Sequence, residues 1–346
     1  MQERLYLDHA ATTPILPAAR DAMIEGFARW ANPSSPHAEG RAAKAELERA
    51  RTRIKAALGW DHHVIFTGGA SEAAALALGR AKTARRFVSA VEHDVVRREA
   101  GDAIVLPVDA GGIVDPAAIG EGALVAIQSV NSETGVIQPA SLAGLIHDRG
   151  ALWLADCAQS AAKMPLPDAD LIILSAHKLG GPPGVGALLV RDLAMLKPTG
   201  GQEQGYRGGT ENLPAVLGFA AALEARGARD HLPMLRAMLD EGARGMGGLV
   251  VAEPSPRLPE IGSYRLPGVP AAGQLIELDL AGISVSAGSA CSSGSLKPSP
   301  VLMAMGWNDT EAREVIRVSL APETSRDDIT RFLEAWARLK ARRAAA

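Results

Sequence analysis

The stretch that decides the fold is Asp170-Leu-Ile-Ile-Leu-Ser-Ala-His-Lys-Leu-Gly-Gly-Pro-Pro-Gly-Val-Gly186. Leu171 to Leu174 form a short apolar run bounded by turn residues, which is typical of a strand buried on both faces. The polar residues Ser175, His177 and Lys178 follow at its end, and the glycines and prolines after them forbid regular structure. The stretch therefore predicts a buried strand that ends in polar side chains.

Lys178 occupies a position that is costly for a charged group, because it follows directly on a buried strand. Desolvation lowers the pKa of a lysine, and only the neutral amine attacks a carbonyl, so this position suits Schiff-base chemistry. A surface lysine on a strand–helix loop is the alternative. This stretch by itself leaves both interpretations open.

Size and composition are those of a soluble globular protein with room for two domains. The 346 residues compare with roughly 100–200 residues per domain. A hydrophobic content of 47% and a charged content of 22% are ordinary. A net charge of -3 gives no electrostatic case for nucleic acid or a membrane surface as a partner.

The sequence shows neither a signal peptide nor an apolar run of the roughly 20 residues that span a bilayer. Its two cysteines, Cys157 and Cys291, are too few for a disulfide framework and too isolated for a zinc site. We therefore expect a cytoplasmic protein without a metal site.

Strand and helix patterns alternate along the first two thirds of the chain. Apolar runs predict strands at 63–67, 86–90, 103–108, 123–130, 151–156, 171–174 and 185–190. Helical patterns are found at 17–30, 39–58, 68–82, after 94 and at 141–149. The alternation predicts an α/β fold with a mostly parallel, helix-covered sheet, whose ligand sites gather at the carboxyl ends of the strands.

The pattern changes toward the end of the chain. Helices are predicted between 213 and 246, followed by shorter strands, a proline- and glycine-rich stretch at 260–273, and helices at 274–281 and from 326. We expect an N-terminal arm, 1–15, that associates with the small domain, a large domain, 16–235, and a smaller α+β domain, 236–346.

Several predicted strand ends carry polar groups that suit one phosphorylated, planar ligand. Gly68-Gly-Ala-Ser71 lies between a strand and a helix N-terminus, where backbone N–H groups favour an anion, although N-capping by Ser71 explains it about as well. Asp156 ends an apolar strand, with Gln159 three residues later. A buried carboxylate needs a cation, for which a pyridinium nitrogen and a structural ion pair are both candidates.

His93 and Asn131 also follow strands. His93 could stack on a ring or shuttle protons, but a single histidine is more often a loop or core residue. Asn131 starts Asn131-Ser-Glu-Thr-Gly135, which is polar where a turn would also be polar.

Taken together, these motifs resemble those of the cysteine desulfurases (NifS/IscS-like) in the class V aminotransferase group of fold-type I pyridoxal phosphate (PLP) enzymes. The resemblance covers nearly the whole chain. Its motifs are Tyr6-Leu-Asp-His-Ala-Ala-Thr-Thr-Pro14, Asn32-Pro-Ser-Ser35 with His37, Thr67-Gly-Gly-Ala-Ser-Glu72, Glu92-His93, Asn131-Ser-Glu-Thr-Gly135, Asp156 with Gln159, Ser175-Ala-His-Lys178, Arg207-Gly-Gly-Thr-Glu-Asn212 and Gly288-Ser-Ala-Cys-Ser-Ser293.

The resemblance implies a role for each matching residue. Lys178 would hold PLP covalently and later move protons, and Asp156 would pair with the ring nitrogen. Gln159 would bond the ring oxygen, and His93 would stack on the ring and act as an acid or base. The phosphate would be held by Ala70, Ser71, Ser175 and His177, joined by Thr210 from the other subunit of a dimer. Asn131 and Arg317 would orient the substrate, with Arg317 as a fork for its carboxylate.

Cys291 separates this family from ordinary transaminases. It lies in Ala287-Gly-Ser-Ala-Cys-Ser-Ser-Gly-Ser295, which is too poor in large apolar groups to pack rigidly. A thiol on such a loop can attack a substrate sulfur and carry it outward. Cys157 follows Asp156 and would point to the opposite face of its strand, so we expect a buried core thiol there.

The resemblance implies a homodimeric, PLP-dependent enzyme that converts L-cysteine to L-alanine and leaves a persulfide on Cys291. The sulfur would serve iron–sulfur clusters, another sulfur-containing cofactor or tRNA, through a scaffold or carrier protein. The stretch after the last helix is shorter than the extension with which housekeeping members dock a scaffold, so the acceptor stays open. A selenocysteine lyase, another class V aminotransferase and a non-catalytic sulfur-transfer partner are the alternatives.

Overall fold

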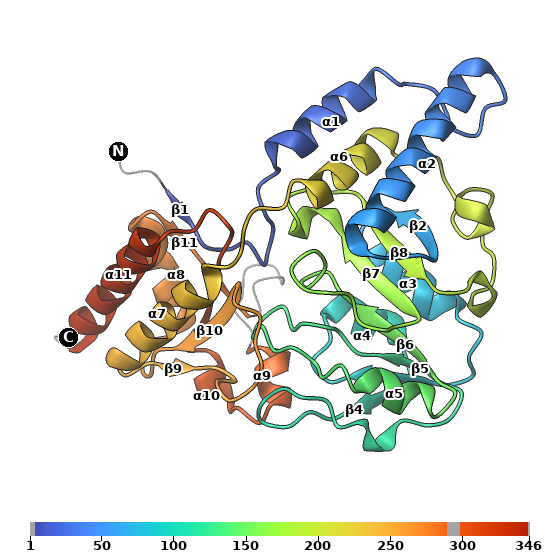
Figure 1. Cartoon of the computed structure of the whole chain (residues 1–346). Helices are drawn as coiled ribbons and strands as arrows, with labels where there is room; N and C mark the ends of the chain where they lie inside the picture. Colours follow the sequence, from blue (N-terminus) through green and yellow to red (C-terminus); the bar gives the residue numbers. More distant parts are fainter. Residues whose placement is uncertain (1–3, 289–297, 345–346) are drawn as a thin grey trace.

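The structure is a computed structural model that describes residues 4–288 and 298–344. The described residues form a seven-stranded, a four-stranded and a two-stranded sheet, and Figure 1 shows the two larger sheets with their helices. A seven-stranded sheet occupies the right of the view, and a four-stranded sheet occupies the left. The N-terminal strand lies beside the four-stranded sheet, far from the helices that follow it in sequence.

The seven-stranded sheet is mostly parallel, as predicted. Only β8 runs against its two neighbours, β2 and β7. Across the sheet the strands are β2 (His63–Thr67), β8 (Gly186–Val190), β7 (Leu171–Ser175), β6 (Leu152–Asp156), β5 (Leu124–Ala126), β3 (Arg86–Ser89) and β4 (Ile104–Leu106). The expected fold class is therefore confirmed.

The strand predicted at 123–130 is shorter in the structure, because β5 ends at Ala126. Beyond that point the side chains of Gln128 and Asn131 donate hydrogen bonds to the Val91 carbonyl, at 2.7 and 3.0 Å. Side-chain bonds thus replace ladder bonds to β3, which has already ended at Ser89. The strand predicted at 103–108 is likewise reduced to β4.

Helices cover both faces of this sheet, and β7 contributes to both cores. Ile172 and Leu174 pack on one side and Leu171 and Ile173 on the other, as the two-residue period of a strand requires. The first side holds α2 (Ala38–Leu58), α5 (Leu142–His147) and α6 (Leu213–Glu224), and the second holds α3 (Ala70–Arg80) and α4 (Asp94–Ala100). Helix α1 (Pro17–Phe27) packs on α6.

The four-stranded sheet is antiparallel and has its own core. Its strands, in order, are β12 (Ser286–Ala287), β13 (Val315–Ser319), β10 (Ile261–Arg265) and β9 (Leu249–Val250). Tyr264, Phe332 and Trp336 are fully buried beside it. Its helices are α7 (Leu232–Gly245), α8 (Ala271–Leu280) and α11 (Arg326–Ala344), with the short α9 (Pro300–Ala304) and α10 (Asp309–Ala312) nearby. No described helix is long and apolar enough to cross a membrane.

The start of the chain belongs structurally to this second core. Strand β1 (Leu5–Tyr6) pairs in parallel with β11 (Ile283–Ser284), and Leu7 is buried in the same apolar cluster. Residues 8–13, which we call the arm, then run to the end of β7, where the Thr13 N–H donates to the His177 carbonyl at 2.9 Å. The arm therefore links the two sheets. The domain limits at 15 and 235 stay predictions.

Candidate active site

The carboxyl ends of β6 and β7 form the centre of the candidate site. The two strands are parallel neighbours, and Asp156 pairs in register with Ile173, so Asp156 and Ser175 end at one edge of the sheet. Lys178 follows in a short 3-10 helix, η2 (Ala176–Lys178). The order of strands in the sheet thus brings together residues that the sequence separates by about twenty positions.

Glycines at this edge allow the backbone of β8 to approach the start of α3 closely. A Cβ at Gly186 would lie 2.8 Å from the Gly69 Cα and 2.4 Å from the Leu174 carbonyl oxygen. Gly69 itself has φ 143, which an L side chain rarely adopts. Gly186 is therefore required by close packing, and Gly69 by its backbone conformation.

Lys178 and Gln159 both contact the backbone of the arm. Lys178 is half-buried, and its Nζ donates to the carbonyl oxygens of Ala10 and Ala11, each at 2.7 Å. The Gln159 Nε2 donates to the Ala10 carbonyl at 2.9 Å. Gln159 Oε1 is buried and has no hydrogen-bond partner within the described residues. A buried amide oxygen without a partner is unusual and indicates room for a ligand donor.

Asp156 is a carboxyl group whose charged form a nearby cation would stabilise. Burial raises its pKa, while the Ala158 N–H, which donates to Oδ1 at 2.9 Å, and the charges of His93 and Lys178 lower it. A second buried carboxyl group, Glu92, lies nearby, and burial together with the charge of Asp156 raises the Glu92 pKa well above its ordinary value. A cationic ring nitrogen would relieve this cost.

His93 lies at the edge of the site. It caps helix α4, where its Nδ1 accepts a hydrogen bond from the Val95 N–H at 3.3 Å, and its side chain is exposed. Its charge lowers the pKa of both Asp156 and Glu133. His93 is thus within electrostatic reach of two acidic groups of the site.

The residues expected to hold a phosphate lie around the start of α3 and the end of β7. Ala70 and Ser71 begin α3, and Ser175 is buried. His177 is half-buried, with Nδ1 3.2 Å from Thr12 Oγ1. Burial and then the neighbouring Lys178 lower the pKa of His177 to about 4, so its ring is neutral near pH 7.

Thr210 lies on an exposed loop near the same helix start. Arg207 of this loop pairs with Glu72 of α3, with 2.8 Å between Nε and Oε1. Glu72 also accepts a hydrogen bond from the Gly68 N–H. The loop is therefore fastened to α3 of its own chain, and contact of Thr210 with a second subunit stays a prediction.

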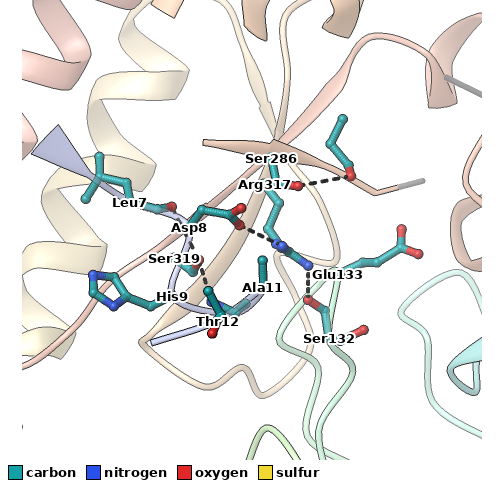
Figure 2. Close-up of polar contacts among 12 residues, drawn as sticks. Leu7, Asp8, His9, Ala11, Thr12, Ser132, Glu133, Ser286, Arg317 and Ser319 are labelled. Atoms are coloured by element: carbon teal, nitrogen blue, oxygen red, sulfur yellow. Dashed lines mark hydrogen bonds and ion pairs between the residues drawn. The ribbon is translucent and has the colours of Figure 1, made fainter. Parts of the chain in front are cut away.

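Arg317, with its contacts Asp8 and Ser132, forms a second part of the site, which we call the Arg317 corner (Figure 2). Arg317 projects from β13 and is buried, with Nη2 2.8 Å from Asp8 Oδ1 and Nη1 donating to the Ser132 carbonyl at 3.0 Å. Its Nε has no partner among residues 4–288 and 298–344. Asn131 shapes the adjoining turn, since its Oδ1 accepts the N–H groups of Glu133 and Thr134, each at 2.9 Å.

Glu133, the third residue of the motif that begins with Asn131, is a further residue of the site that was not predicted from the sequence. Burial raises the pKa of Glu133 to about 7, while the Ser299 hydroxyl, Arg317 and His93 act to lower it. The Ser299 Oγ donates to Glu133 Oε2, and a Cβ at Gly288 would collide with the same oxygen. The motif Asn131-Ser-Glu-Thr-Gly135 contains this glutamate, but a glutamate in a turn is usually solvated, so the motif gives no reason to expect its burial.

Of the two cysteines, the structure describes Cys157. Cys291 lies outside the described residues. Just before that gap, Ser286 of β12 pairs in register with Arg317. Cys157 is buried in the core of the seven-stranded sheet, and burial raises its pKa to about 12. Its thiol is therefore protonated at neutral pH, as expected for a core residue.

Known proteins are similar to this chain over most of its length. The family model for class V aminotransferases matches residues 5–332. A cysteine desulfurase from Cereibacter sphaeroides is 37% identical over 365 residues, which cover 96% of this chain and 94% of that relative. The chain belongs to the cysteine desulfurase family. It is thus an enzyme of the class V aminotransferase group, and the predicted family is confirmed.

Solved structures are also similar to the chain over nearly its whole length. A NifS-like protein superposes with a TM-score of 0.87 at 27% identity, covering 98% of this chain and 99% of that one. A structure described as SspA in complex with cysteine has a TM-score of 0.79 at 29% identity, with 93% and 100% covered. These neighbours agree with the expected fold-type I architecture.

Proposed function

We propose that this cysteine desulfurase uses PLP to convert L-cysteine to L-alanine and passes the sulfur to Cys291 as a persulfide. The observation that carries the proposal is the placement of Lys178 and Asp156 at the adjoining carboxyl ends of β7 and β6. A lysine amine for a carbonyl and a carboxylate for a cationic nitrogen are the two groups that PLP requires. The family depends on PLP in general.

The residues present fit this cofactor. Asp156 has a pKa raised by burial and would gain a cation in the ring nitrogen. Gln159 Oε1, which has no partner in the described part of the chain, would gain a donor in the ring hydroxyl. Lys178 would hold the cofactor covalently, and His93 would cover the ring. The phosphate would lie against Ala70, Ser71, Ser175 and His177, with Thr210 of a second subunit. PLP, when bound, withdraws electrons from the carbon to which the substrate amine is attached.

The protein side chains would then supply orientation and proton transfer. Arg317 and Asn131 would hold the substrate so that its Cα faces Lys178, whose Nζ would take and return protons at that carbon. Asp156 would keep the ring nitrogen protonated. With its pKa lowered to about 4, His177 is too weak a base to compete with Lys178 for a proton.

Cys291 would be the nucleophile toward sulfur. Its thiolate would form a bond to the substrate sulfur while the bond from that sulfur to Cβ breaks. The electron pair of the broken bond would stay with the substrate carbon, which gains a proton to give L-alanine. A thiol-carrying acceptor protein, such as an iron–sulfur scaffold or a sulfur carrier, would then remove the sulfur in the cytoplasm.

The test is sulfur and alanine production by matched cysteine variants. Cys291→Ala should bind PLP and L-cysteine but lose alanine formation, and mass spectrometry of the parent should find one added sulfur on Cys291. Cys157→Ala is the control and should keep activity, because that thiol is buried and protonated. Full activity of Cys291→Ala, or the added sulfur on Cys157, would contradict the mechanism. L-Selenocysteine in the same assay tests the lyase alternative.

A homodimer is part of the proposal. Three large apolar residues in and just after α1 are exposed, Ile24 by 62%, Phe27 by 67% and Trp30 by 80%. A solvated monomer seldom exposes so many large side chains together, whereas dimer interfaces are rich in them. Sedimentation should give a dimer, and Trp30→Glu should weaken it. An active monomer would contradict both the interface and the role of Thr210.

A further inference from the structure

Asp8 forms an ion pair with the residue that we propose as the anchor of the substrate carboxylate. Its Oδ1 lies 2.8 Å from Arg317 Nη2, and the side chains are 20% and 9% exposed. The two residues are 309 positions apart. In Figure 2, Asp8 reaches the guanidinium from the arm, while Ser132 contacts it from the opposite loop. A carboxylate of the protein thus already occupies part of the anchor.

Neighbouring bonds hold Asp8 in this position. Ser319 lies two residues after Arg317 on β13 and therefore on the same face. Its Oγ accepts the Ala10 N–H at 2.9 Å, and its N–H donates to the Leu7 carbonyl at 2.8 Å. The Tyr6 hydroxyl donates to the Asp8 carbonyl at 3.1 Å and is 2.9 Å from the Thr12 carbonyl. The turn that carries Asp8 is thus bonded on both sides.

Arg317 retains hydrogen-bonding capacity in the presence of Asp8. A guanidinium has five N–H groups in a planar fork. Asp8 and Ser132 take one bond each, and the buried Nε has no partner within the part of the chain that the structure describes. An incoming carboxylate can therefore bond to Arg317 without first displacing Asp8. It would then share a single positive charge with the Asp8 carboxylate.

We propose that Asp8 is a positioning residue that orients Arg317 and, as a built-in competing charge, limits the affinity of the site for α-carboxylates. The proposal rests on the proposed role of Arg317. Substrate and product both carry this carboxylate, so Asp8 weakens the binding of L-cysteine and of L-alanine together. Release of L-alanine is thereby eased at the expense of a higher KM for L-cysteine.

The experiment compares Asp8→Asn with Asp8→Glu in the PLP-loaded enzyme. Asparagine keeps an oxygen for Arg317 but removes the charge, and glutamate keeps the charge. In Asp8→Asn, the KM for L-cysteine and the dissociation constant of L-alanine by calorimetry should both fall by about threefold to tenfold, as loss of a nearby like charge implies. Neither should fall in Asp8→Glu. Asp8→Ser, also uncharged, replaces Asp8→Asn if that variant does not fold.

Two controls separate this proposal from the role of Arg317. Cysteamine lacks the carboxylate, so its KM should not fall in Asp8→Asn. Tyr6→Phe loosens the same turn without changing the charge beside Arg317, and it should not increase affinity for L-alanine. An unchanged or weaker affinity for L-alanine in Asp8→Asn would overturn the proposal. If Arg317→Lys leaves the KM for L-cysteine unaltered, the anchor itself is wrong, whatever Asp8 does.

Discussion

The two halves of the candidate site are built differently. The half that would hold the cofactor, with Lys178 and Asp156, lies at the ends of two hydrogen-bonded neighbours in one sheet. The half around Arg317 brings together three distant segments, represented by Asp8, Ser132 and Arg317. A sheet determines the first by register alone, whereas the second exists only when the arm and both sheets are packed together. We therefore expect changes at the sheet edge to abolish chemistry, and changes at the Arg317 corner to alter affinity.

The largest effect is expected from Lys178→Ala. Loss of the Lys178 amine at the end of β7 should remove the absorbance band of bound PLP and reduce alanine formation by more than about a thousandfold. Lys163→Ala is a matched control, because Lys163 is a lysine whose pKa burial lowers to about 8 and to which we give no role. An unchanged band in Lys178→Ala would mean that Lys178 does not hold the cofactor and that the sheet edge is not the centre of the chemistry.

Asp156→Asn should have the next largest effect. Asparagine keeps the shape but cannot hold the ring nitrogen protonated, so kcat should fall by about a hundredfold or more while the fold persists. Glu92→Gln is the control. Burial raises the Glu92 pKa well above its ordinary value, which favours the neutral carboxyl group, so the amide should reduce kcat far less. Parental turnover in Asp156→Asn would make Asp156 a structural residue.

Arg317→Lys should act mainly on affinity. Lysine preserves the charge but loses the planar fork, so the KM for L-cysteine should rise by about tenfold to a hundredfold, with a smaller change in kcat. Steady-state kinetics with L-cysteine and with cysteamine would separate the two parameters. An equal loss for both substrates would mean that Arg317 supports the fold and does not bind the carboxylate.

The smallest effect is expected from Glu133→Gln, and it depends on pH. The raised pKa, about 7, means that Glu133 is neutral below that pH and becomes negative above it. The new charge near Arg317 should increase the KM for L-cysteine, relative to that for cysteamine, by about threefold as pH rises from 6 to 8. In Glu133→Gln the ratio should be flat. The same slope in both proteins would exclude Glu133 as its source.

Residues close together in sequence carried most of the information about the sheet edge. The strand at 63–67 was predicted at its observed limits, and the helix before it was predicted to end at Leu58, where α2 ends, ahead of Gly59 with φ 64. Lys178 and Asp156 could be singled out because each follows an apolar strand. Periodicity and turn chemistry are local properties of a chain, so the sequence exposes them directly.

Only the tertiary structure decided the Arg317 corner. The sequence motif that contains Asp8 does not indicate the role of this residue, since its partner Arg317 lies 309 residues away. The pKa of Glu133 likewise depends on burial by Ser299 and by residues of the four-stranded sheet. Ion pairing and desolvation arise from surfaces that meet only when the chain is packed, and no local pattern records which surfaces will meet. For this protein, the sequence by itself determined the fold, the family and the groups at the strand ends, whereas packing of the arm between two sheets decided the charge around the substrate anchor.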